Sequence, residues 1–407
     1  MNDKRIIYSL LSALSAVMLS SCSQEDLALH SLADDDDAVV FISSLPVVTT
    51  RSDGDTDKNS LDAGFQVTAF APEDETKIGA SNKLNEYFAD QLVTKTPGMG
   101  DAFRSDMCRW PANSGSKKGT LKFFAFYPSC EALRESVGVA SNSSYFVLSN
   151  TSKKTTTSAT YTYTLTKFKI NSDISKHVDF VAATAEGNKT QHLYSGVTLT
   201  FAHQLSRVDI QAWGAPTSYE LEIAGVRMGN VYMEGTCNFS GTWTSQSTRG
   251  IVEYIYGEGD KIISVGKSKD KNKSAATAVS IMGNGGHAMV IPGSYSAWNK
   301  SKTGTGSYFS VLLRVNDKAG KLLYPYIEGA DLNANKKAED MKVVYLSIEK
   351  SSGLVKKRLY KKDGDYYTSD KFSVESIYNI PADEEIRSYG WAAGPISSTT
   401  WRAGTQY

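Results

Sequence analysis

The chain has 407 residues, and its 44 basic side chains balance 44 acidic ones, so the formal net charge is zero. This balance argues against a nucleic-acid-binding protein, which needs a basic surface, and against a strongly cationic partner. The length predicts two domains that can each build a core, and 22 tyrosines, 15 phenylalanines and 32 glycines favour strands and turns over long helices.

The first 22 residues carry the most informative pattern of the chain. Two basic residues, Lys4 and Arg5, precede an apolar stretch that is too short to span a membrane comfortably and that ends in Leu19-Ser20-Ser21-Cys22. This order predicts a lipoprotein signal peptide at residues 1–21, with Cys22 as the acylated first residue of the mature protein, since several acyl chains anchor a protein stably. The alternative is an ordinary cleaved signal peptide followed by a coincidental cysteine.

A polar tether and then a series of short strands are expected after the signal peptide. Residues 22–37 end in four aspartates, Asp34 to Asp37, which repel one another and therefore predict a solvated acidic tether rather than a metal site. The first expected strand is residues 38–43, which contain Val39, Val40, Phe41 and Ile42. Alternating or apolar segments predict further strands at 65–70, 121–127, 161–170, 178–183, 197–212, 219–226, 288–291, 308–315, 342–348 and 372–380.

The long segment at 197–212 has a break in its alternation near Ala202-His203, which predicts a bulge or bend between two strand halves. Beyond the signal peptide, no segment keeps a helical period for long. Many short strands separated by turn residues predict an all-β protein built as a sandwich or barrel.

Three cysteines remain if Cys22 is acylated: Cys108, Cys130 and Cys237. Cys108 and Cys130 flank one expected strand and its approach, so either these two pair or all three are small buried hydrophobic residues.

Motifs for catalysis, cofactors and metals are absent from the sequence. No two of the five histidines have metal-ligand spacing, and there is no phosphate-binding loop or nucleophile elbow. The loop at 53–59 alternates oxygen-bearing side chains, but Lys58 and Gly64 stand where a calcium loop needs glycine and glutamate. A glycosidase needs two carboxylates that face each other, and the sequence pairs none. We therefore expect no enzyme, no cofactor and no metal.

Several segments occur in an order that resembles the Bacteroidales fimbrillins, which include the Mfa-like group of fimbrial lipoproteins. These segments are Leu19–Cys22, Thr50-Arg51, Leu121–Pro128, Val178–Ala183, Val197–Ile210, Tyr389–Ala393 and Trp401–Gly404. The resemblance implies two tandem transthyretin-like β-sandwich domains, expected here at 38–195 and 196–407. The boundary is expected between Ala185 and Gly196, with residues 213–216 as the alternative.

The resemblance also implies a structural or adhesive subunit of a cell-surface fimbria (pilus). Such a lipoprotein is anchored to the outer membrane through Cys22, and an arginine-specific protease would cut between Arg51 and Ser52. The strand Val39–Ile42 would then leave a groove that a strand of another fimbrial subunit fills, because an open sheet edge is a template for pairing. Further candidate partners are ligands on host or bacterial surfaces.

A non-polymerising surface lipoprotein that binds a glycan or host ligand is the alternative function. Trp213, Trp243 and Trp298 are candidate stacking residues for a sugar, although packing is the commoner use of such side chains. Family members usually run on past the closing segment with another alternating strand, whereas this sequence stops at Tyr407. Either the chain is truncated, or its last strand comes from residues 397–400 or from a partner. This departure favours an accessory, tip or anchor subunit over a polymerising stalk subunit.

Overall fold

The computed structural model is built mainly of β-strands with a few short helices, which confirms the expected all-β class. It describes residues 37–45, 61–71, 86–111, 119–154, 159–213, 218–246, 248–265, 278–299, 306–325, 343–362, 364–368, 379–397 and 399–407. The transthyretin-like topology of the two domains stays a prediction.

Contacts divide the chain into two compact units, which are described separately. Unit 1 comprises residues 1–168, 178–205 and 236–244, and unit 2 comprises 169–177, 206–235 and 245–407. This division places residues 196–205 in unit 1. Unit 1 also includes residues 236–244, which are flanked in sequence by unit 2, and unit 2 includes residues 169–177, which are flanked by unit 1. The linear domains expected at 38–195 and 196–407 stay a prediction, because compactness alone does not establish independent folding.

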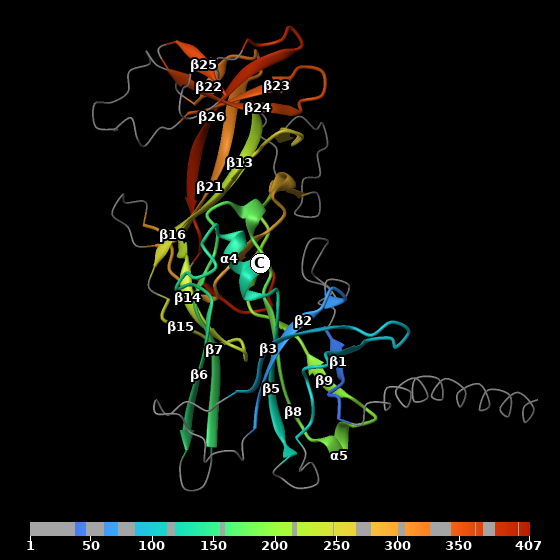
Figure 1. Cartoon of the computed structure of the whole chain (residues 1–407). Coiled ribbons are helices and arrows are strands. Elements are labelled where there is room, and N and C mark those ends of the chain that lie inside the picture. The colour runs from blue at the N-terminus through green and yellow to red at the C-terminus, as the bar shows by residue number, and fades with distance from the viewer. Residues whose placement is uncertain are drawn as a thin grey trace, which may run out of the picture. The chain divides into compact units, whose positions relative to one another are not determined.

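The main sheet of unit 1 has eight strands in the order β10-β8-β5-β2-β3-β4-β1-β9 (Figure 1). The strands are β1 (Phe41–Ser44), β2 (Phe65–Phe70), β3 (Glu86–Lys95), β4 (Ala102–Arg104), β5 (Leu121–Tyr127), β8 (Val181–Gly187), β9 (Val197–Thr200) and β10 (Ala202–His203). Its two end strands, β9 and β10, are separated only by Phe201, and β9 pairs with β1 whereas β10 pairs with β8. The predicted bend near Ala202-His203 is thus confirmed, and this one segment links both ends of the sheet.

The central strand β5 is buried on both faces, which explains its nearly continuous apolar sequence. On one face Phe123 packs against Trp110, with ring centroids 5.9 Å apart. On the other face Phe124 and Phe126 pack against Phe239 at 5.8 and 5.7 Å. A second sheet, in the order β15-β14-β7-β6, lies almost wholly in unit 1 and consists of β6 (Val147–Lys154), β7 (Ala159–Lys169), β14 (Glu234–Asn238) and β15 (Trp243–Thr244).

Unit 2 is built on a longer sheet in the order β16-β13-β21-β26-β23-β24-β25, with β17 added to β13 and β22 to β21. These strands are β13 (Tyr219–Tyr232), β16 (Arg249–Ile255), β17 (Ile263–Val265), β21 (Tyr308–Asp317), β22 (Leu322–Tyr324), β23 (Val344–Glu349), β24 (Val355–Lys362), β25 (Asp365–Tyr367) and β26 (Glu384–Pro395). Three two-stranded pairs complete it: β11 (Ser206–Val208) with β19 (Ala288–Val290), β12 (Gln211–Ala212) with β18 (Val279–Ser280), and β20 (Gly293–Tyr295) with β27 (Thr399–Trp401).

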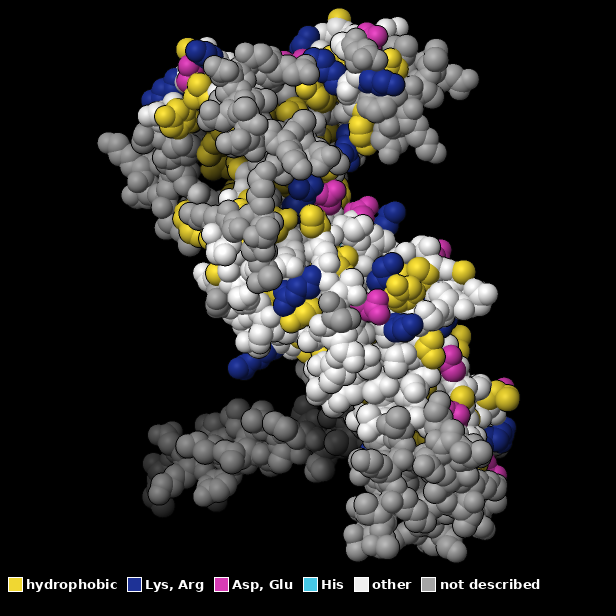
Figure 2. Space-filling view, turned by 90° about the vertical axis from the view of Figure 1, so that its left-hand side faces the viewer, with side chains coloured by type: hydrophobic (Ala, Val, Ile, Leu, Met, Phe, Trp, Pro, Cys, Tyr) yellow, Lys and Arg dark blue, Asp and Glu magenta, His cyan; other side chains and the backbone are white. Residues whose placement is uncertain are grey.

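Helices are short throughout the described residues. They are α4 (Cys130–Ser136), α5 (Lys189–His192) and the 3-10 turns η4 (Ile174–Lys176) and η6 (Gly283–Gly285). Every described helix is too short or too polar to cross a membrane. On the face drawn in Figure 2, the hydrophobic side chains of the described residues lie in small groups among polar and charged ones.

Candidate functional site

The candidate site is the place of residues 37–44 in unit 1. Of the four residues expected to be exchanged, Phe41 and Ile42 lie in β1, whereas Val39 and Val40 directly precede it. β1 lies between two strands and pairs with both, antiparallel with β4 and parallel with β9 (Figure 1). Backbone pairing begins before the strand itself, since the Val39 N–H donates to the Cys108 carbonyl at 2.8 Å and the Trp110 N–H donates to the Asp37 carbonyl at 2.7 Å. The segment from residue 37 to 44 is therefore bonded along both edges.

The side chains of this segment are buried alternately on two faces, as the period of a strand requires. Val39 and Phe41 are fully buried in the main core of unit 1, where the Phe41 and Phe123 rings meet edge to face with centroids 5.2 Å apart. Val40 lies on the other face in a small cluster with Ala102, and Ile42 packs against that cluster. All four predicted residues thus have packing partners.

Gly196, directly before β9, allows this close packing. It has a φ of +67°, and a Cβ at this position would lie 2.8 Å from Cγ1 of Ile42. The Val197 N–H that follows donates to the Val40 carbonyl at 2.8 Å. A side chain at position 196 would therefore push against β1.

The walls around β1 are apolar and aromatic. The core cluster that holds Val39 and Phe41 also contains Phe103, Trp110 and Leu199, each at most 3% exposed. Loss of β1 would expose these side chains and leave the facing backbone groups of β4 and β9 without partners. Such a groove matches a strand with large apolar side chains at alternate positions.

The three described cysteines are free and buried, so the Cys108–Cys130 pair does not form and the alternative of small buried residues is confirmed. Burial raises the pKa of Cys108 to about 12, against a smaller lowering effect of its hydrogen bond with Ser105. Burial likewise raises the pKa of Cys130 to about 12. Thiols in this state are unreactive, because the thiolate is the nucleophile.

Two further residues singled out by the sequence have packing roles in unit 1. His203 is 7% exposed, and its Nδ1 lies 2.6 Å from Oδ2 of Asp179. Trp243 donates from Nε1 to the Gln204 carbonyl at 2.8 Å and packs edge to face on Phe168. Trp243 is therefore a structural side chain rather than an open platform for a sugar.

The other two candidate stacking residues lie in unit 2 and differ from each other. Trp298 packs against Tyr308 with ring centroids 5.4 Å apart. Trp213 is 56% exposed and remains open for a ligand.

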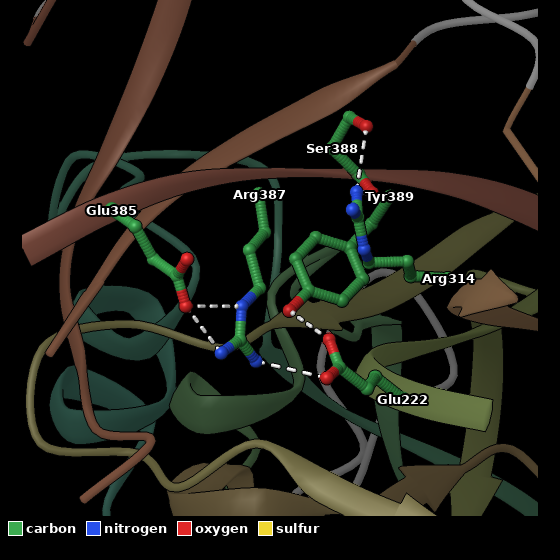
Figure 3. Close-up of polar contacts among 6 residues, drawn as sticks. All are labelled: Glu222, Arg314, Glu385, Arg387, Ser388 and Tyr389. Carbon is green, nitrogen blue, oxygen red and sulfur yellow. Dashed lines mark hydrogen bonds and ion pairs between the residues drawn. The ribbon is translucent and has the colours of Figure 1, made fainter. Parts of the chain in front are cut away.

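A polar network crosses the central strands of unit 2, and sequence reasoning missed it (Figure 3). The Arg387 guanidinium donates to Oε1 of Glu222 at 2.9 Å and, through Nε, to Oε1 of Glu385 at 3.0 Å. Tyr389 donates to the other oxygen of Glu222 at 3.2 Å, and burial together with the charge of Glu222 raises the pKa of this phenol. Because one guanidinium bridges both carboxylates, the group is an ion-pair network that joins β13 to β26.

The remaining expected sites cannot be placed. Cys22, Arg51 and Ser52 lie outside the described residues, as does the loop at 53–59. Within the described part of the chain, no three His, Cys, Asp or Glu side chains are grouped so that they would hold a metal ion.

Comparison with known proteins supplies the context for this geometry. A family model described as fimbrillin-like matches residues 50–339. Among curated protein sequences, none matches the chain.

Solved structures give only distant likenesses. A proposed cell adhesion protein of Bacteroides ovatus is 14% identical over 69% of this chain and 83% of its own, with a TM-score of 0.31. One from Bacteroides uniformis is 11% identical over 88% and 98%, with a TM-score of 0.29. The fimbrial anchor protein Mfa2 from Porphyromonas gingivalis is 12% identical over 81% and 98%, with a TM-score of 0.25.

Proposed function

The chain belongs to the fimbrillin-like family, and we propose that it is a structural or adhesive subunit of a cell-surface fimbria with no catalytic role. In this proposal the precursor is a lipoprotein of the outer membrane, anchored through Cys22, and its partners are other fimbrial subunits. The observation that carries the proposal is β1, a strand of four residues that is paired along both edges and covered on both faces. Loss of this strand would leave a groove that a strand of another subunit can fill.

The energetics of the groove favour replacement over an empty state. Each of the buried side chains Val39, Val40 and Phe41 contributes about 1.5–3 kcal/mol. Ile42 is partly buried and contributes less. Removal of β1 forfeits this burial and also leaves backbone groups of β4 and β9 unpaired, which an apolar site tolerates poorly. An incoming strand that alternates in the same way restores both contributions, whereas the chain's own β1 blocks assembly until it is removed.

Cleavage between Arg51 and Ser52 would release the segment that holds β1 from the rest of unit 1. β1 ends at Ser44, and the sequence from 51 to 59 is polar, a setting that favours proteolysis. After such a cut, noncovalent contacts alone would retain β1.

The test is the N-terminal sequence and intact mass of the protein from the cell surface, for the wild type and for Arg51→Lys. The lysine variant keeps the positive charge but removes the site of an arginine-specific protease. We expect wild-type protein that begins at Ser52 in high-mass assemblies, and variant protein that begins at acylated Cys22 and stays monomeric. Monomeric wild-type protein with only acylated Cys22 at its N-terminus would overturn assembly and leave a ligand-binding lipoprotein.

Alkylation of Cys108 adds a direct readout of the groove. Its backbone carbonyl accepts the bond from Val39, so loss of β1 uncovers this residue, whereas Cys130 on α4 serves as an internal control. A return of the Cys108 pKa from about 12 to an ordinary value of about 8.5 raises the thiolate fraction near neutral pH by roughly a thousandfold. Equal protection of both thiols in cleaved, unassembled protein would argue that β1 had not left.

A further inference from the structure

Unit 2 contains an open cavity of about 540 Å³, within the range of about 300–1,000 Å³ that is usual for small-molecule sites. Three large aromatic side chains at this cavity are accessible: Trp213 is 56% exposed, Phe309 36% and Tyr407 38%. Exposed aromatic faces gathered in one concave place are a feature of binding sites rather than of a packed core.

The aromatic wall formed by Tyr407 is held in place by hydrogen bonds and stacking. The Tyr407 hydroxyl accepts from the Arg402 N–H at 2.9 Å and donates to the Thr400 carbonyl at 3.1 Å. Its ring lies beside Trp401, with centroids 6.0 Å apart, and Trp401 lies 4.4 Å from Tyr295. A ring fixed at its polar end offers a preorganised apolar face to a ligand.

Polar groups at the cavity are also oriented, and one of them lacks a partner. The Asp209 carboxylate accepts from His287 at 2.8 Å, from Arg207 at 3.0 Å and from Nε2 of Gln406 at 2.7 Å. Burial alone would raise the pKa of Asp209, but the hydrogen bond from His287 and the charge of Arg207 outweigh it and lower the pKa.

The orientation of the Gln406 amide follows from this carboxylate. A carboxylate only accepts, so the amide must turn its NH₂ group toward Asp209 and its Oε1 away. That Oε1 is buried and has no hydrogen-bond partner among the described residues. A buried acceptor without a donor costs about 1–3 kcal/mol. Because Oε1 has almost no accessible surface, a ligand hydroxyl in the cavity would recover this cost after a small rotation of the Gln406 side chain.

The backbone of the cavity wall excludes a β-strand as the occupant. The Arg207 N–H donates to the Thr405 carbonyl at 3.0 Å, and the Asp209 N–H donates to the Tyr407 carbonyl at 2.9 Å. On the other side, β11 pairs with β19, and β12 pairs with β18. Strand addition needs a free edge, and this segment is paired on both sides.

The lining also constrains the charge and polarity of the ligand. No Lys, Arg or His is among the described residues that line the cavity, so an anion would find no direct counter-charge there. A purely aliphatic ligand would leave the Gln406 acceptor unsatisfied. A pyranose ring presents an apolar C–H face to an aromatic ring and hydroxyl donors at its edge.

We propose that this cavity binds a neutral pyranose sugar, with Trp213 as a stacking platform and Gln406 as a hydrogen-bond acceptor. The site lies wholly within unit 2, so it does not depend on exchange of β1. It would give a fimbrial subunit a receptor for glycans.

The test is ligand-observed saturation-transfer NMR on the full-length protein with glucose, galactose, mannose and N-acetylglucosamine, and with N-acetylneuraminic acid as the charged comparison. Three proteins are compared: wild type, Trp213→Ala and Tyr219→Ala. Tyr219 is a matched control because it is an exposed aromatic residue of unit 2, at 48%, that does not line the cavity. Trp213 is exposed to a similar extent, so its removal should leave folding intact.

We expect at least one neutral sugar to bind, with affinity reduced about five- to tenfold in Trp213→Ala and unchanged in Tyr219→Ala. Transfer to none of the four neutral sugars at about 10 mM, which detects a Kd near 1 mM, would overturn the proposal. Equal weakening by both variants, or stronger binding of the charged sugar, would overturn it as well.

Discussion

The two units differ in how their main sheets are held together. In unit 1 the sheet is linked through β1, β4 and β9, which have only four, three and four residues. In unit 2 the central strands β13, β21 and β26 have 14, 10 and 12 residues, and β21 pairs along its whole length with β13 and over six residue pairs with β26. Unit 1 therefore depends on a short segment near its start, whereas unit 2 depends on long neighbouring strands.

The side chains at these places differ in the same sense. The segment Val39–Ile42, the β1 seam, is apolar, and its Val39 and Phe41 side chains lie in the core. The centre of unit 2 is tied by directional contacts, such as the ion pair of Arg387 with Glu222 and the stacking of Arg227 on Trp391 at 3.9 Å. Any strand with the right apolar alternation can fill the first kind of site, whereas the second fixes particular partners. The comparison therefore agrees with the proposal that strand exchange takes place in unit 1, and it makes unit 2 the more fixed scaffold.

The largest expected effect comes from Phe41→Ala. Phe41 is fully buried against Phe123, so its truncation leaves a cavity and should destabilise unit 1 by about 3–5 kcal/mol. Hydrogen exchange of the full-length protein, read peptide by peptide, should show faster exchange in β1, β4 and β9. Peptides of unit 2 should be unaffected.

Phe309→Ala is the matched control, since it removes the same side chain from unit 2 where it is 36% exposed. Its effect on the free energy of unfolding should be smaller than that of Phe41→Ala, because the Phe309 side chain is only partly buried. Similar losses in the two variants would break the comparison, as would acceleration of exchange in both units by Phe41→Ala.

The stability of unit 2 should depend on pH through His177. His177 accepts the Met289 N–H at Nδ1, 2.9 Å away, and its Nε2 lies 2.8 Å from the Asn171 carbonyl. Both contacts together need the neutral ring with its proton on Nε2. Burial lowers the pKa of His177 to about 4, against the smaller opposite effects of the bond to Asn171 and the charge of Asp173.

Below an ordinary histidine pKa of about 6.5, the unfolded chain therefore takes up a proton that the folded chain does not. The stability contribution of His177 is fully present above pH 6.5 and is lost as the pH falls toward about 4. The slope is about 1.4 kcal/mol per pH unit, so roughly 2 kcal/mol is lost by pH 5. The protection factors of the β19 amides, taken against the intrinsic exchange rate at each pH, should therefore fall on acidification.

His177→Gln is the control for this pH dependence, because an amide can donate and accept at one end without titrating. The protection factors of the β19 amides should depend less on pH in the variant than in the wild type. Equal slopes in the two proteins would assign the acid sensitivity to another group.

Much of unit 1 could be predicted from local sequence. The apolar run at 121–127 and the alternation at 161–170 correspond to β5 and β7, whereas the strand expected at 38–43 begins later, as β1 at Phe41–Ser44. Other strands were missed. β3 and β24 carry many exposed polar residues, as in the sequence VKKRLYKK of β24, so their alternation was hidden. The expected strand at 372–380 lies mostly outside the described residues.

The candidate sites also differ in how far local sequence could predict them. The four residues of the β1 seam are contiguous, so a pattern could reveal them. The sugar site brings together Asp209, Phe309 and Gln406, which are about 100 residues apart in sequence and follow no spacing rule. The ion pair between Glu222 and Arg387 depends likewise on the order of β13, β21 and β26, which single-sequence patterns do not specify. Among the residues that line the cavity, the sequence indicated only Trp213 as a candidate for ligand binding, and it could not predict how exposed this side chain is.

The smallest expected effect tests how closely β1 is fitted, through Gly196→Ala compared with Gly138→Ala. Both glycines lie in unit 1 with nearly equal φ, +67° and +65°, so alanine causes similar backbone strain of about 1–2 kcal/mol at each. A Cβ at 138 meets nothing within 4 Å, whereas one at 196 lies 2.8 Å from Cγ1 of Ile42. Gly196→Ala should therefore cost about 1 kcal/mol more and loosen β1 specifically.

The measurement is the alkylation rate of Cys108 relative to Cys130, which should rise only in Gly196→Ala. Equal alkylation rates in the two variants would mean that β1 tolerates displacement at its edge. Val39 and Phe41 alone would then hold the β1 seam in place.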